Sequence, residues 1–257
     1  MEKQYHLGFD DSHGARYALL PGDPGRVEQI ALNLDNPRFF HQNREYTAWV
    51  GYLLGERVLV ISTGMGGPST AIAVEELYKT GVNTFIRVGT CGGMADEVKG
   101  GDVVIANAAI RMEGTSREYV PIEFPAAANI DVTNALIKAA EQNNSKFHVG
   151  VVQSKDSFYG QHDPERQPIG YDLLNKWDAW LKAGCLASEM ESAALYIVAQ
   201  VLRARAGCAL HVVWNKDREK KGLSSPFSHD TGNVSKITVD AVRILIEQDM
   251  KKRYKIG

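Results

Sequence analysis

A glycine-rich turn at residues 22–26 could hold an anion. The residues Gly22-Asp23-Pro24-Gly25-Arg26 follow an apolar run and lead into a segment of helical period. Glycine lets the backbone approach a ligand and proline favours the start of a helix, so free N–H groups and the Arg26 guanidinium would meet at one point. The same residues also suit a tight turn with an exposed arginine. Because the stretch matches neither the P-loop nor GxGxxG, it does not indicate ATP or NAD binding.

A second arginine, Arg87, lies inside the apolar run FIRVG, and Thr90 follows that run. Burying a guanidinium is costly unless it meets an anion or a carboxylate. Two interpretations therefore stay open, a phosphate ligand and a salt bridge to an internal acid. Cys91, next in the chain, is expected to be a small packed residue rather than a nucleophile.

A pair of carboxylates, Glu189 and Glu191, stands where a strand-like segment passes into a helix. Two acceptors separated by one residue suit a pair of vicinal hydroxyls, such as those of a ribose. Alternatively, Glu191 complements the helix dipole and Glu189 pairs with an arginine. Spacing alone favours the second interpretation.

The elements that position these residues alternate between short runs rich in valine and isoleucine and longer segments of helical period. This alternation predicts an α/β fold, one three-layer α/β/α domain over residues 1–257. A Gly-Glu turn between two strand-like runs predicts a hairpin within residues 47–62, so the central β-sheet should be mixed. The expected strands are 17–20, 57–62, 84–89, 101–110, 148–154 and 208–214. The expected helices are 68–80, 172–183, one that starts at Glu191 and ends before Gly207, and 233–252, with long loops at 155–170 and 215–232.

Composition restricts the class of protein. A net charge of −2 argues against a nucleic-acid partner, and no stretch approaches the roughly 20 apolar residues of a membrane span. Three widely spaced cysteines favour a reducing compartment over a disulfide framework. With no signal-peptide pattern at the start, a cytoplasmic protein is expected. The histidines show no HExxH pattern, so no catalytic metal is indicated.

Seven motifs occur in order along the chain: LGF, LPGDPGRVEQIA, NREYTAW, STGMGGPSTAIAVEEL, FIRVGTCGG, DSFYGQ and SEMESAAL. Together they resemble the nucleoside phosphorylase family, most closely its bacterial members that act on uridine. The resemblance implies phosphorolysis of uridine, and of deoxyuridine or thymidine, with inorganic phosphate as co-substrate and no cofactor. The alternatives are a purine nucleoside phosphorylase or nucleosidase on the same fold, and a non-catalytic protein that binds nucleoside or phosphate.

The resemblance also implies roles for individual residues. Phosphate would be held by Gly22, Arg26, Arg87 and Thr90, with Arg44 supplied by a neighbouring subunit. The ribose would meet Met190 and Glu191, supported by Glu189, and the neighbour's His6 would reach the 5′-hydroxyl. Sites shared in this way require at least a dimer, and the family suggests a hexamer of three dimers. A structural potassium or other monovalent cation at Glu45 and Ser69 is also compatible with the resemblance.

The base would stack near Phe158 and be read by Gln161. The family pairs that glutamine with an arginine two positions on, where this chain has Asp163. We expect Arg166 to take over, with His162 as the alternative donor.

The base class is indicated by the end of the last strand-like run. Related purine enzymes place an aspartate there that protonates the leaving group, whereas this chain has Asn215. An asparagine cannot supply that acid, which favours a pyrimidine, although Asp217 lies close by.

Overall fold

The structure is a computed structural model that describes residues 2–256, so residues 1 and 257 of the expected domain lie outside the described residues. Its strands are β1 (Tyr17–Leu20), β2 (Asp35–Asn43), β3 (Tyr46–Leu53), β4 (Glu56–Ile61), β5 (Thr84–Gly93), β6 (Val103–Met112), β7 (Ala126–Ala127), β8 (Phe147–Lys155), β9 (Ala187–Glu189) and β10 (Arg205–Trp214). Its helices are α1 (Val27–Ala31), α2 (Gly67–Lys79), α3 (Thr115–Tyr119), α4 (Ile130–Gln142), α5 (Phe158–His162), α6 (Gly170–Lys182), α7 (Ser192–Val201), α8 (Lys216–Lys220) and α9 (Gly232–Ile256).

The sheet is mixed, as predicted. Its strands follow the order β10-β6-β8-β9-β5-β1-β4-β3-β2, with β7 on β6, and β3 and β4 form the expected hairpin. Because β10 pairs with both β5 and β6, the strands β5, β9, β8, β6 and β10 close into a ring, which the sequence pattern does not predict. The carboxyl ends of β5 and β8 pair with β9, and the carboxyl end of β10 lies beside that of β5, so these ends lie at one rim of the ring. The rim therefore gathers residues that are far apart in the sequence.

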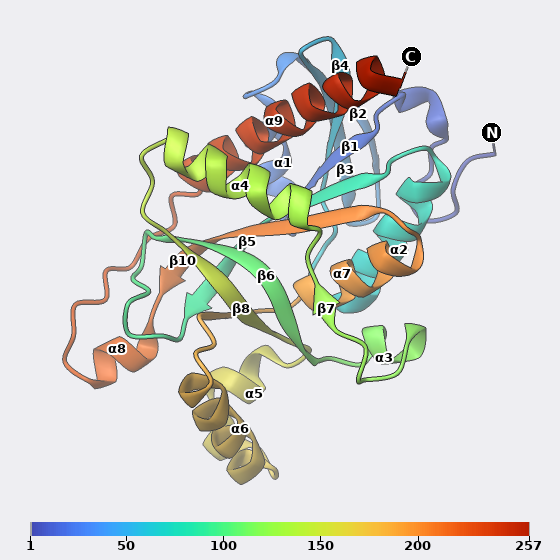
Figure 1. Ribbon diagram of the computed structural model, residues 1–257. Coiled ribbons are helices and arrows are strands. Elements are labelled where there is room, and N and C mark those ends of the chain that lie inside the picture. The colour runs from blue at the N-terminus through green and yellow to red at the C-terminus, as the bar shows by residue number, and fades with distance from the viewer. Residues whose placement is uncertain (1, 257) are drawn as a thin grey trace.

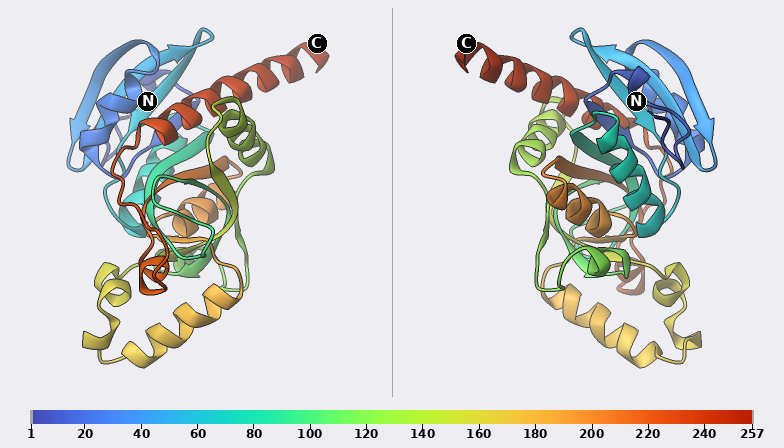
Figure 2. Two further views of the ribbon diagram at one scale, coloured as in Figure 1. Left: turned by 90° about the vertical axis from the view of Figure 1, so that its left-hand side faces the viewer. Right: turned by 90° about the vertical axis from the view of Figure 1, so that its right-hand side faces the viewer.

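Two helical layers cover the sheet and confirm the α/β/α architecture. One buried cluster joins the sheet to α2 and α7, and a second joins it to α1, α4 and α9. Figure 1 places α4 and α9 above the sheet and α2 and α7 on its other side. By contrast, α5 and α6 project from the body, as the two side views in Figure 2 show, and in α6 the buried residue is Gly170 alone.

Two sequence expectations are corrected, and some elements were not predicted. The helix that starts after Glu191 ends at Val201 rather than before Gly207, because Arg203 adopts a left-handed conformation (φ 58°) and Arg205 already belongs to β10. The segments expected as long loops contain α5, a 3-10 turn (Pro164–Arg166) and α8. The strand β2 and the helix α4 were not predicted.

No helix within residues 2–256 is both long enough and apolar enough to cross a lipid bilayer.

Close packing between β10 and α4 predicts the effect of a single added methyl group. A Cβ atom on Gly207 would lie 2.4 Å from Val132 Cγ1, a distance at which one of the two elements must shift. We expect Gly207→Ala to lower the free energy of unfolding by about 1–3 kcal/mol, measured by urea denaturation. Val132→Ala in the same chain should remove the clash, so the double variant should lose less than the sum of the two single losses. Additive losses would contradict this account.

Candidate active site

The centre of the site is a buried ion cluster at the rim of the ring. Arg87 is 5% exposed, and its Nε donates to Glu189 Oε2 over 3.1 Å while its Nη2 pairs with Glu191. Burial alone would lower the pKa of Arg87, but the charges of Glu191 and Glu189 outweigh it, so the pKa is raised. The salt bridge to an internal acid, one of the two interpretations of Arg87, is therefore present.

Glu189 is the more completely bonded of the two carboxylates. It accepts hydrogen bonds from the backbone N–H of Glu191 (2.8 Å) and of Ser192 (3.0 Å), from the Ser154 hydroxyl and from Arg87. Its partners come from β5, β8 and the start of α7, so this carboxylate holds three elements together. Little capacity remains for a ligand.

Glu191 is held from a different side. Its Oε1 accepts the N–H of Gly66 over 2.6 Å, in the turn before α2, and its other oxygen faces Arg87. Burial raises the pKa of Glu191, Arg87 opposes that rise, and the pKa is raised overall. With Met190 half-buried beside it, Glu191 has fewer donors than Glu189 and so retains acceptor capacity for hydroxyl groups.

A cradle for an anion forms next to this cluster. Asp23 accepts the N–H of Gly25 over 2.8 Å, and the resulting 3-10 turn turns Arg26 inward. A Cβ atom on Gly22 would lie 3.8 Å from Arg87 Nη1 and 3.9 Å from Arg26 Nη2, so both guanidiniums border the space that this glycine leaves free.

Two nitrogens in the cradle lack acceptors. Among the described residues, the Nη1 atoms of Arg26 and Arg87 are buried and have no hydrogen-bond partner. Burial lowers the pKa of Arg26, and the nearby Arg87 lowers it further. Two cationic side chains with buried, unused donors favour binding of an anion, because leaving such donors without an acceptor is costly. Thr90, three residues beyond Arg87 in β5, is half-buried.

The residues expected from a neighbouring subunit lie elsewhere. Arg44 is exposed in the β2–β3 turn with φ 52°, and His6 is held by Glu76, whose Oε1 is 2.6 Å from His6 Nδ1. Within the described residues, neither forms a hydrogen bond or ion pair with Arg87. Whether they complete a partner's site is a prediction that a single chain does not test.

Glu45 and Ser69, the expected cation residues, both lie against Gly64. A Cβ atom on Gly64 would be 3.0 Å from Glu45 Cγ and 3.4 Å from Ser69 Oγ. The Ser69 hydroxyl donates to the Met65 carbonyl over 3.2 Å. The structure thus brings the two residues near each other, without testing whether a cation binds.

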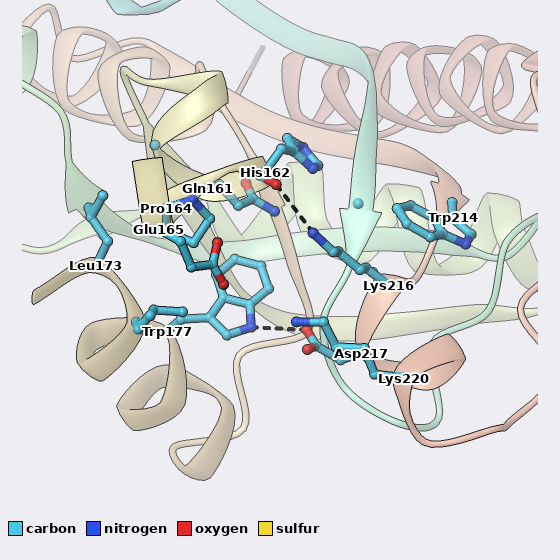
Figure 3. A pocket seen from close by; sticks show the side chains of 14 residues that line it. Gln161, His162, Pro164, Glu165, Leu173, Trp177, Trp214, Lys216, Asp217 and Lys220 are labelled. Carbon is cyan, nitrogen blue, oxygen red and sulfur yellow. Dashed lines mark hydrogen bonds between the residues drawn. The ribbon is translucent and has the colours of Figure 1, made fainter. Parts of the chain in front are cut away.

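Two of the predicted base-binding residues, Phe158 and Gln161, lie together on α5. Ser157 caps this helix by accepting the N–H of Gly160, and the rings of Phe158 and His162 lie 4.2 Å apart between centroids. Gln161 Oε1 is 2.7 Å from the hydroxyl of Ser188 in β9. Gln161 and His162 also line a pocket with Trp177, Trp214, Lys216 and Asp217, from α6, β10 and α8 (Figure 3).

Arg166 does not reach this pocket. Its side chain is 66% exposed, and its Nε pairs with Asp163 Oδ2 over 2.9 Å across the 3-10 turn. The turn directs the guanidinium outward, so the structure does not bring Arg166 to Gln161. The alternative donor His162 does line the pocket, and burial lowers its pKa.

One buried residue was missed by the sequence prediction. Lys155, assigned to a loop, is the last residue of β8 and is 4% exposed, with its Nζ 2.8 Å from Ser188 Oγ. The available signal was a lysine directly after the strand-like run HVGVVQS.

Asn215 acts as a structural residue. Its Oδ1 accepts the N–H groups of Asp217 and Arg218, each over 3.1 Å, which caps α8, and its Nδ2 donates to the carbonyls of Ala95 and Val98. Asp217 accepts the indole N–H of Trp177 over 2.9 Å (Figure 3). The strand end thus carries a fully bonded amide rather than a free carboxylic acid.

The ion cluster predicts unequal stability losses for the two arginines. Arg87→Met would leave two buried carboxylates without their cation, so the free energy of unfolding should fall by about 3–5 kcal/mol. Arg26→Met is the matched control and should lose much less, since the ion pair of Arg26 with the exposed Asp23 is 4.0 Å long. Equal losses in denaturation experiments would contradict the central position of Arg87.

Comparison with known proteins agrees with the geometry. The family model of the phosphorylase superfamily matches residues 16–246. The uridine phosphorylase of Treponema pallidum is 50% identical over 246 residues, which cover 96% of this chain and 95% of that protein. The uridine phosphorylase of Escherichia coli is 38% identical, covering 94% and 98%, and a guanosine phosphorylase of Halorubrum lacusprofundi is 40% identical, covering 84% and 85%. This chain therefore belongs to the phosphorylase superfamily.

Proposed function

We propose that this protein is a uridine phosphorylase, which splits uridine with inorganic phosphate into uracil and ribose 1-phosphate. The observation that carries the proposal is the pair of buried, unused Nη1 donors of Arg26 and Arg87 beside Gly22, where Arg87 also pairs with Glu191. An anion site directly next to a carboxylate that retains acceptor capacity suits phosphate and a sugar diol held side by side. The names of the relatives support the same reaction.

Phosphate binds in the cradle of Gly22, Arg26, Arg87 and Thr90. The phosphate accepts hydrogen bonds from the two guanidiniums and lies below C1′ of the ribose. One phosphate oxygen forms a bond to C1′ while the C1′–N1 bond breaks and its electron pair passes to the base. The transition state carries positive charge on the sugar, and the phosphate anion stabilises it.

The ribose hydroxyls donate to Glu191, and Met190 packs against the sugar. Glu189 has a positioning role, because its hydrogen bonds fix both Arg87 and the backbone that carries Glu191. Both substrates thus contact groups whose positions depend on the same ion cluster.

The base lies at α5, near the ring of Phe158. Gln161 offers a donor and an acceptor to the edge of the uracil ring, and His162 supplies a further donor. The bonded amide of Asn215, where the related purine enzymes carry an acid, favours a pyrimidine leaving group over a purine.

The complete enzyme is an oligomer with shared sites. The exposed Arg44 would reach the phosphate of a partner subunit, and His6, oriented by Glu76, would reach its ribose. We extend the proposal to a hexamer of three dimers, each chain one domain over residues 1–257, with potassium at Glu45 and Ser69. A cytoplasmic location fits three cysteines that are all free thiols.

The phosphate cradle predicts strict dependence on orthophosphate. Uridine with phosphate should give ribose 1-phosphate, detected by chromatography, and phosphate-free enzyme should leave uridine intact. Arg26→Met should raise the phosphate KM by roughly 10- to 150-fold, because a charge-assisted contact is worth roughly 1.5–3 kcal/mol, while the uridine KM changes little. The same assay with thymidine, deoxyuridine, inosine and adenosine tests which bases and sugars the enzyme accepts. Free ribose formed without phosphate would replace the proposal with a nucleosidase, and uridine binding without turnover would replace it with a binding protein.

Shared sites predict complementation between two inactive variants. Arg44→Ala and Glu191→Gln each damage every site of their own oligomer. After subunit exchange in an equal mixture, a mixed dimer holds one site with both native residues and one with neither. About a quarter of wild-type activity should therefore return. If the mixture stays as inactive as its components, the sites are not shared through Arg44.

A further inference from the structure

A lysine is buried next to the glutamine assigned to the base. Lys155 donates to Ser188 Oγ over 2.8 Å, and its other contact, to the Glu189 carbonyl, is 3.5 Å long. An ammonium group carries three donors, so this one has donor capacity left. Lysine is almost never fully buried without a partner for its charge. The side chain therefore needs an explanation beyond packing.

The Ser188 hydroxyl connects Lys155 to the base site. Ser188 Oγ lies 2.7 Å from Gln161 Oε1 and 2.6 Å from Gln153 Oε1. It accepts from Lys155 and can donate its single hydrogen to one glutamine at a time. Lys155, Gln153 and Gln161 also line a common cavity of about 250 Å³, with Trp177 in its wall. Lys155 and the glutamine assigned to the base thus line the same space.

Lys155 differs from Arg87 in having no carboxylate of its own. The carboxylates nearby, Glu189 and Glu191, are already paired with Arg87, and within the described residues Lys155 forms no ion pair. Burial lowers the pKa of Lys155 to about 8, and the attraction of Glu189 and Glu191 limits the fall. The amine is therefore still charged at neutral pH. Arg166, the cation expected here, is 66% exposed and paired with Asp163.

Building on the proposed function, we propose that Lys155 is the catalytic cation that meets the departing pyrimidine. As the C1′–N1 bond breaks, its electron pair spreads over N1 and the carbonyl oxygens of the ring. Lys155 Nζ donates to one of these oxygens while Gln161 binds the same ring. The uracil anion takes a proton from solvent after release. A donor aimed at developing charge in a closed site contributes about 10²–10³-fold in rate.

The test compares two leaving groups in charge-removing variants. Lys155→Met removes the amine, and Lys155→Gln keeps a donor for Ser188 without the charge. Lys176→Met, on the exposed face of α6 and paired with Asp172, is the matched control. At saturating phosphate, both Lys155 variants should lose about 100-fold or more in kcat with uridine. They should lose tenfold or less with 5-fluorouridine, whose base forms a more stable anion and needs less help. The control should be unchanged with both substrates.

A pH profile gives an independent measurement. Wild-type kcat with uridine should fall as the pH rises through about 8, where Lys155 loses its proton, and the Lys155 variants should lack this fall. The other titratable groups near the amine are the carboxyl groups of Glu189 and Glu191, the His162 ring and the Cys91 thiol. Burial lowers the pKa of His162 and raises that of Cys91 well above its usual value. Neither His162 nor Cys91 can therefore account for a change near pH 8.

Equal loss with both nucleosides, or loss in proportion to a lower thermal midpoint, would give Lys155 a structural role and overturn the inference. It would also be overturned if Arg166→Met, rather than the Lys155 variants, lost activity selectively with uridine. These outcomes differ from failure of the proposed function, in which the wild-type protein itself makes no ribose 1-phosphate.

Discussion

The site depends on one constraint, the burial of two carboxylates around a single arginine. Glu189 and Glu191 are each less than 5% exposed, and both pair with Arg87, because a buried charge without a partner is costly. The guanidinium binds both of them and still keeps Nη1 free. Strands β5, β8 and β9, the turn before α2 and the start of α7 all contribute to this cluster. The closed ring of strands is what brings these segments to one rim.

The shared arginine couples the two halves of the substrate site. Phosphate would bind the unpaired Nη1 of Arg87. The sugar would bind Glu191, which pairs with Nη2 of the same guanidinium. A small displacement of Glu189 would therefore disturb both sites at once, although Glu189 itself is bonded to protein groups. Charges also balance across the cluster, because Arg87 and Lys155 offset the two glutamates. Arg26 then adds the positive charge that an incoming anion can neutralise.

Much of the fold could be predicted from the sequence, because strand and helix periodicity is local. The alternating runs located most strands of the ring, and the Gly-Glu turn located the hairpin. Closure of the ring could not be predicted, since it depends on β10 pairing with two partners. The early end of α7 was missed because Arg203, not a glycine, adopts the left-handed conformation. The strand β2 was missed because its burial does not alternate regularly.

The site shows a similar division. Arginine in an apolar strand and paired glutamates identified candidate residues, but their spacing could not show that they pair with each other. For the base, the family pattern pointed to Arg166 as the next arginine in sequence, whereas an i,i+3 contact with Asp163 holds its side chain at the surface of this single chain. Lys155 was assigned to a loop, although β8 carries it into the interior. Which cation faces inward is decided by tertiary structure.

The central claim is that the two unused guanidinium nitrogens next to Gly22 are donors to phosphate. The most direct measurement is a crystal structure with phosphate and pseudouridine, whose carbon–carbon glycosidic bond the reaction cannot break. The account predicts a phosphate within about 3 Å of Nη1 of both Arg26 and Arg87, beside a ribose whose hydroxyls donate to Glu191. A phosphate bound elsewhere, or an Arg87 whose Nη1 bonds to protein groups while the anion is present, would contradict it.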